Sequence, residues 1–128
     1  MVNAMKTATG SFIDAFPATG QLNDQSDAVT ATAYAASGAI AEGDTVVNLN
    51  KTSKIEMTIA RPRPGRLLVI KQIDAGTAGH TVTLTAGTWD LTGNTIATFN
   101  AQNECLVVLG ISDKRFLILD NNGSVALS

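Results

Sequence analysis

The residue with the most obvious capacity for chemistry is His80, the single histidine of the chain. It lies in the stretch DAGTAGHTVTLTAGTW, with Asp74 before it and Asp90 after it. Imidazole is a common general base and metal ligand, and nearby carboxylates could assist it in either role. A metal site would need further His or Cys ligands, but the chain contains one histidine and one cysteine. We therefore expect no metal and no cofactor at His80.

Neither the serines nor the cysteine of the chain has the sequence context of a catalytic nucleophile. The sequence contains no G-x-S-x-G elbow that would expose a catalytic serine. Cys105 follows the acidic Glu104, whereas a reactive thiolate needs a positive neighbour, and the apolar run ECLVVLG predicts a buried, inert side chain. A glycosidase with paired carboxylates stays open, although only Trp89 and Tyr34 could serve as aromatic platforms for a sugar. We expect no catalytic centre.

The element that positions His80 has the pattern of a β-strand. In HTVTLT, Val82 and Leu84 alternate with threonines, which predicts one apolar face and one polar face. His80 shares the parity of Val82 and Leu84, so we expect it at the rim of a core, bonded to backbone or water. Other strand-like segments, separated by Gly, Pro, Asn and Asp, are 45–49, 54–60, 67–73, 94–100, 104–111, 115–120 and 124–128.

The spacing of these segments indicates an all-β domain. Their centres are roughly 8–14 residues apart, which leaves no room for the helices of a βαβ fold. We predict a compact antiparallel β-sandwich or jelly-roll-like barrel over residues 45–128. Residues 1–44 are rich in small and polar side chains and gain little from burial, so we expect an extended N-terminal arm. Its apolar anchor would be Phe12, Ile13 and Phe16.

Charge is distributed unevenly along the chain. The net charge of −2 predicts no general attraction to nucleic acid. Residues 1–50 carry one basic and five acidic side chains, whereas residues 51–78 carry six basic and two acidic ones. These two parts are expected to attract each other within one chain or between neighbouring copies, or else to form an ordinary mixed surface.

A proline-containing connector, ARPRPGR, carries three of the basic side chains. Proline fixes φ and has no N–H, so this segment cannot lie inside a sheet. Arg61, Arg63 and Arg66 could pair with the carboxylates of a partner, or the connector could be a solvated loop.

Features of membrane insertion and secretion are missing from the sequence. No apolar run approaches the roughly 20 residues of a membrane helix. The start, MVNAMKTATG, lacks the apolar region of a secretory signal. We therefore expect a soluble protein made in the cytoplasm, with no membrane partner.

The second half of the chain, from Pro64 to Ser128, resembles a group of small structural proteins of tailed bacteriophages. The resemblance rests on GRLLVI, AGTAGHTVTL, AGTWD, ATFNA, a hairpin ending in RFLILDN and the terminal GSVALS, in this order. These motifs consist of turn and core residues, so the resemblance concerns a fold and not a chemistry. It implies a capsid decoration (cement) protein, or a related virion surface protein. Such a protein binds the outside of an expanded icosahedral shell and clamps adjacent major capsid subunits.

The resemblance also implies where the protein acts and with which partners. It would be synthesised in the host cytoplasm and lie on the capsid exterior, bound to the major capsid protein and to further copies of itself as a homodimer or homotrimer. The alternative is a phage tail-fibre or receptor-binding β module, which is also rich in Thr and Gly. A third class, a hydrolase on a β-sandwich, would use His80, Asp74 and Asp90. The candidate docking residues are Phe12, Ile13, Phe16, Arg61, Arg63 and Arg66.

Overall fold

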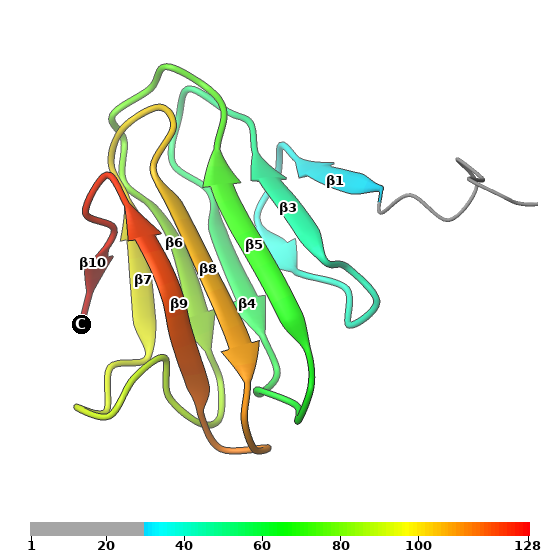
Figure 1. The fold of residues 1–128 in the computed structure, drawn as a ribbon. Coiled ribbons are helices and arrows are strands. Elements are labelled where there is room, and N and C mark those ends of the chain that lie inside the picture. Colours follow the sequence, from blue (N-terminus) through cyan, green and yellow to red (C-terminus); the bar gives the residue numbers. More distant parts are fainter. Residues whose placement is uncertain (1–29) are drawn as a thin grey trace, which may run out of the picture.

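The computed structural model describes residues 30–128, which form two five-stranded sheets packed face to face (Figure 1). In spatial order, sheet A consists of β1 (Ala31–Tyr34), β3 (Val46–Leu49), β5 (Leu67–Gln72), β8 (Cys105–Gly110) and β9 (Phe116–Asn122). Sheet B consists of β10 (Ala126–Leu127), β7 (Ile96–Phe99), β6 (His80–Leu84), β4 (Glu56–Ile59) and β2 (Gly38–Ala39). The predicted all-β sandwich is confirmed. No helix in this part of the chain is long and apolar enough to cross a membrane.

The chain alternates between the two sheets until it reaches β6. As a result β1, β3 and β5 are parallel neighbours in sheet A, and β2, β4 and β6 are parallel neighbours in sheet B. Parallel neighbours need a crossover connection, and here each crossover contains a strand of the opposite sheet. The later pairs β6–β7, β5–β8, β8–β9 and β7–β10 are antiparallel. The sheets are therefore mixed, where the sequence pattern predicted antiparallel strands.

Strands of the β-sandwich occur before the boundary predicted at residue 45. β1 is in register with β3 from Ala31↔Val46 to Tyr34↔Leu49, and β2 pairs with β4. Ile40, directly after β2, is 4% exposed and packs in the core. Residues 31–44 thus belong to the sandwich and not to an extended arm.

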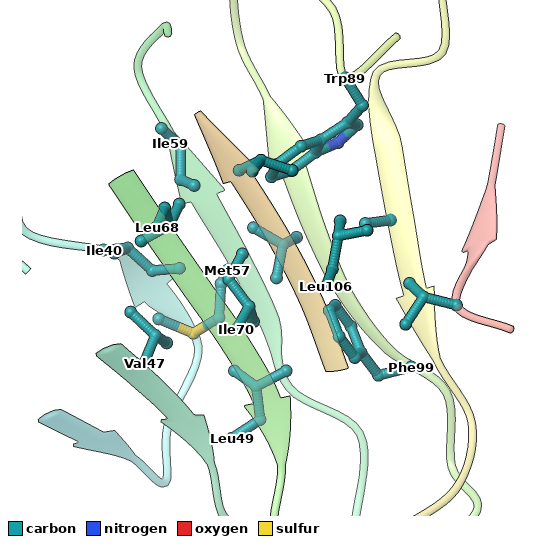
Figure 2. Close-up of a cluster of buried hydrophobic side chains, with 14 of the residues drawn as sticks. Ile40, Val47, Leu49, Met57, Ile59, Leu68, Ile70, Trp89, Phe99 and Leu106 are labelled. Atoms are coloured by element: carbon teal, nitrogen blue, oxygen red, sulfur yellow. The ribbon is translucent and has the colours of Figure 1, made fainter. Parts of the chain in front are cut away.

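The hydrophobic core fills the space between the two sheets, as Figure 2 shows. It is built from the inward half of each alternating strand, and the predicted inward positions Val82 and Leu84 are both buried. At one end the rings of Trp89 and Phe116 stack with centroids 5.2 Å apart. A fully buried aliphatic or aromatic side chain contributes about 1.5–3 kcal/mol, so this layer is the main source of the stability of the fold.

Candidate interaction surfaces

His80 lies wholly inside the sandwich, with none of its surface exposed. Its Nδ1 accepts a hydrogen bond from the backbone N–H of Ile55 at 3.1 Å, so the ring proton is on Nε2. Nε2 donates this proton to Asp74 Oδ1 at 3.0 Å. The predicted inward direction of His80 is confirmed, but the residue lies deeper than the rim. Both ring nitrogens of this neutral tautomer are used within the protein.

The carboxylate of Asp74 is the centre of a buried polar cluster. Its Oδ1 also accepts the backbone N–H of Lys51 at 3.1 Å, and its Oδ2 accepts the N–H of Gly76 at 2.9 Å. The amide Nε2 of Gln72 donates to the carbonyl oxygen of Gly76 at 2.6 Å. Burial raises the pKa of Asp74, but the hydrogen bonds from His80, Gly76 and Lys51 outweigh it and hold the pKa below its usual value.

The other carboxylate considered with His80 is engaged in its own turn. Asp90 Oδ1 accepts the backbone N–H groups of Thr92 and Asn94, each at 3.1 Å. No group of three or more His, Cys, Asp or Glu side chains within residues 30–128 is placed to hold a metal ion. The His80–Asp74 pair also offers no free ring nitrogen to a substrate in this conformation. The cluster therefore joins backbone segments of the fold.

Two of the three connector arginines make contacts within the chain. Arg63 Nη2 lies 3.1 Å from Glu42 Oε2, with both side chains more than half exposed. Arg66 Nη2 donates to the backbone carbonyl oxygens of Ala41 at 3.0 Å and Asp44 at 3.2 Å. The expected attraction between the acidic first part and the basic middle part thus operates within one chain at these positions. An exposed pair such as Arg63–Glu42 is worth at most about 1 kcal/mol.

The connector is fixed to the end of β8 by its backbone. The N–H of Gly65 donates to the carbonyl oxygen of Gly110, and the N–H of Gly110 donates to the carbonyl oxygen of Arg66, both at 2.7 Å. The approach is so close that a Cβ on Gly110 would collide with the carbonyl group of Arg63. Arg61 is exposed on this fixed connector, and its guanidinium makes no ion pair with a carboxylate of the described residues.

The outward face of sheet B is polar. Thr58 is in register with Thr83, and Thr81 is in register with both Glu56 and Thr98. These side chains are intermediate or exposed. Polar outward side chains are expected in a sheet that packs one face on the core and exposes the other face to water.

The outward face of sheet A carries an apolar area, which the sequence pattern did not single out. The polar side chains Asn48, Lys71 and Asp120 lie beside it on the same face. Two rows of aliphatic side chains cross it in register, one over β3, β5 and β8 and the other over β5, β8 and β9. Leu67 and Leu117 are 43% and 46% exposed. We call this surface the apolar face of sheet A; its residues are Val46, Val69, Val107, Leu67, Leu109 and Leu117.

The signal for this face was present in the sequence of β5 and β8. The run LLVIKQI is almost continuously apolar, and such runs are typical of strands that are covered on both faces. In the structure Leu68 and Ile70 face the core, while Leu67 and Val69 face outward without a cover among the described residues. Cys105 has the same outward parity and is only partly buried, which corrects the prediction of a buried cysteine.

Comparisons with protein families and with curated proteins identified no relative of this chain. No family model matches the chain, and no curated protein is similar to it. Of the six predicted docking residues, the structure places the three arginines of the connector. The predicted apolar anchor lies outside the described residues, at Phe12, Ile13 and Phe16.

Proposed function

We propose that this chain is a virion structural protein, a capsid decoration (cement) protein that binds the outer surface of a bacteriophage shell. Two things support the proposal: the resemblance of residues 64–128 to small phage structural proteins, and a β-sandwich fold. The observation that carries it is the apolar face of sheet A. Contiguous exposed apolar surface on a small domain marks a place where another protein binds.

The proposed mechanism is mechanical and involves no catalysis. A protein that docks across the junction between adjacent major capsid subunits adds interface area, and this area must be lost before the subunits can separate. Each contact needs to contribute only several kcal/mol, because association has its own entropic cost and the shell repeats the contact many times. As a homodimer or homotrimer, the protein would add contacts that act together through their effective concentration.

Three elements are assigned to docking under this proposal. The apolar face of sheet A supplies the buried contact, and Arg61 on the fixed connector supplies an exposed guanidinium that can pair with a carboxylate of the major capsid protein. The predicted anchor residues Phe12, Ile13 and Phe16 are the third element. Neither a membrane nor a nucleic acid is a partner in this proposal.

The tail-fibre or receptor-binding module is the alternative function. Such modules commonly hold glycans on exposed aromatic rings. Trp89 is fully buried here, and the hydroxyl of Tyr34 donates to the carboxylate of Asp44. These two side chains thus give the alternative no support.

The test uses expanded phage shells that were assembled without this protein. We expect the purified chain to bind these shells and to raise their melting temperature in calorimetry. The double variant Val69→Thr/Val107→Thr should bind at least tenfold more weakly, because it makes the apolar face polar at nearly constant volume. Thr83→Val, on the outward face of sheet B, is the matched control and should bind like the natural chain.

Two results would contradict the proposal. One is a shell whose melting temperature does not change when the protein is added. The other is immunogold label that is confined to the tails of intact virions, which would favour the receptor-binding alternative.

A further inference from the structure

A pocket of about 190 Å³ opens beside β9. Figure 1 shows β9 as the strand at one edge of sheet A. The pocket lies where the β6–β7 loop meets the start of β9, at the bridge between Thr88 and Arg115. At its rim Leu91 is 83% exposed, far more than any other large apolar side chain of the described residues. The pocket is lined by Asp90, Leu91, Arg115, Phe116, Leu117 and Ile118.

The size and lining of this pocket suit an aromatic ring. An engineered apolar cavity of about 150 Å³ is large enough to hold benzene, so this pocket has room for a phenyl group. Phe116, which is 1% exposed, also lines it and stacks in turn on Trp89, so an entering ring would lie against the edge of an existing aromatic pair. The lining thus selects a flat apolar side chain.

The positive charge of Arg115 at the pocket favours a ligand that carries a carboxylate close to its aromatic ring. Arg115 forms no ion pair with a carboxylate of residues 30–128. The carboxylate of Asp90 is turned to its own loop, where its Oδ2 accepts Asn94 Nδ2 at 2.8 Å. A ligand with a carboxylate close to an aromatic ring would therefore meet both requirements of the site.

We propose that this pocket holds the segment 11–17, SFIDAFP, of the same chain. In the sequence of this segment Asp14 stands between Phe12 and Phe16. One ring occupies the pocket next to Leu91, and the carboxylate of Asp14 pairs with Arg115. The inference concerns the free protein and does not depend on a role at the capsid; on a shell, the shell and the pocket would compete for the same segment.

The length of chain before β1 allows this docking. Ala31 lies seventeen positions after Asp14, and an extended chain of that length spans up to about 55 Å. The two edges of sheet A, β1 and β9, are four strand spacings apart, which is about 19 Å. A single ring and one ion pair bind weakly between separate molecules, whereas a tether supplies an effective concentration in the millimolar range. We therefore assign the segment of the same chain and not that of a second copy.

Trp89 supplies the first test, because it is the single tryptophan of the chain and contacts the pocket through Phe116. In the full-length Phe12→Ser/Phe16→Ser variant we expect a changed tryptophan emission and a shifted indole N–H resonance. Leu22→Ser, which removes an apolar side chain outside the segment, should change neither. The synthetic peptide GSFIDAFPA, added to the double variant at the roughly millimolar concentration that the tether supplies, should restore both signals. Spectra of the double variant that are identical to those of the natural chain would overturn the proposal.

Disulfide trapping tests the same contact without removing either ring. In a Cys105→Ala background, Ala15→Cys is combined with Thr92→Cys, next to Leu91 at the pocket, or with Glu56→Cys, on the outward face of sheet B. We expect mild oxidation to give an intrachain disulfide in the first pair at least tenfold faster than in the second. Equal rates would overturn the proposal. Disulfide-linked dimers as the sole product would show that the occupant belongs to a second copy, and would overturn the assignment to the same chain.

Discussion

His80 Nε2 and Asp74 Oδ1 lie 3.0 Å apart in the interior, and this pair joins two connections that are distant in sequence. Asp74 belongs to the loop between β5 and β6, and it also accepts the N–H of Lys51 in the connection between β3 and β4. His80 accepts the N–H of Ile55 in that same connection. Unpaired backbone N–H groups in this position would each cost about 1–3 kcal/mol, so the pair stabilises both connections at once.

Replacing Asp74 with asparagine tests this role. The amide group of Asn has two donors, so it cannot accept all the hydrogen bonds that Lys51, Gly76 and His80 donate to the carboxylate. Because buried donors would lose their acceptor, we expect Asp74→Asn to lower the free energy of unfolding by about 2–4 kcal/mol. Urea denaturation at pH 7 measures the change. Asp113→Asn, in the exposed β8–β9 turn, should behave like the natural chain, and equal stability of both variants would refute the structural role.

Asp90 gives a prediction for the pH dependence of stability. Burial raises its pKa, but hydrogen bonds from Asn94 and Thr92 outweigh this and lower the pKa below the ordinary value of 3.8. A group whose folded pKa is depressed stabilises the protein fully above its unfolded pKa, and this contribution is lost as the pH falls through the folded pKa. We expect Asp90→Asn to be less stable than the natural chain at pH 6, and the difference to shrink as the pH falls below 3.8.

Urea titrations of both proteins at several pH values between about 2 and 6 measure this difference. Acid-induced changes elsewhere in the chain affect both proteins equally, so they cancel in the comparison. A stability difference that stays constant over the whole range would mean that the charge of Asp90 contributes nothing.

Much of the fold could be predicted from the alternation of apolar and polar residues. A strand that packs one face on the core has an apolar residue at every second position, and this period is visible in the sequence. Seven of the eight predicted segments contain an observed strand, as HTVTLT contains β6, and the segment 115–120 overlaps β9, which continues through Asn121 and Asn122, where a turn was predicted. The short β1 and β2, with sequences ATAY and GA, are held by their neighbours and carry too few apolar residues to show a period. Parallel and antiparallel strands alternate alike, so the mixed sheets could not be predicted.

The surfaces were harder to predict, since their features depend on contacts between distant residues. ECLVVLG is apolar at almost every position, so its sequence does not show whether Cys105 or Leu106 faces the core. The structure turns Leu106 inward and Cys105 outward. Arg61 and Arg66 look equivalent in ARPRPGR, yet only Arg66 meets the carbonyl groups of Ala41 and Asp44.

The contact between the connector and β8 predicts a strong effect at Gly110. Its backbone is bonded to Gly65 and Arg66, and a Cβ would collide with the backbone of Arg63, which cannot move as a flexible side chain would. We expect Gly110→Ala to lower the free energy of unfolding by more than about 2 kcal/mol. Gly43→Ala, where a Cβ meets nothing within 4 Å, is the control and should leave stability nearly unchanged. Thermal unfolding followed by circular dichroism distinguishes them, and a Gly110→Ala variant as stable as the control would be inconsistent with the close approach.

Two arginines of the connector are expected to have different roles, Arg66 in the stability of the fold and Arg61 in binding to the shell. Arg66 is partly buried and donates two charge-assisted hydrogen bonds to carbonyl groups, so Arg66→Ala should lower the free energy of unfolding by about 1.5–3 kcal/mol. Arg61→Ala removes an exposed guanidinium without an ion-pair partner in residues 30–128 and should not change stability. If the proposed capsid role is right, Arg61→Ala should instead weaken binding to expanded shells, and most clearly at low salt, where exposed charges are least screened. Unchanged shell binding by a stable Arg61→Ala protein would remove Arg61 from the docking surface.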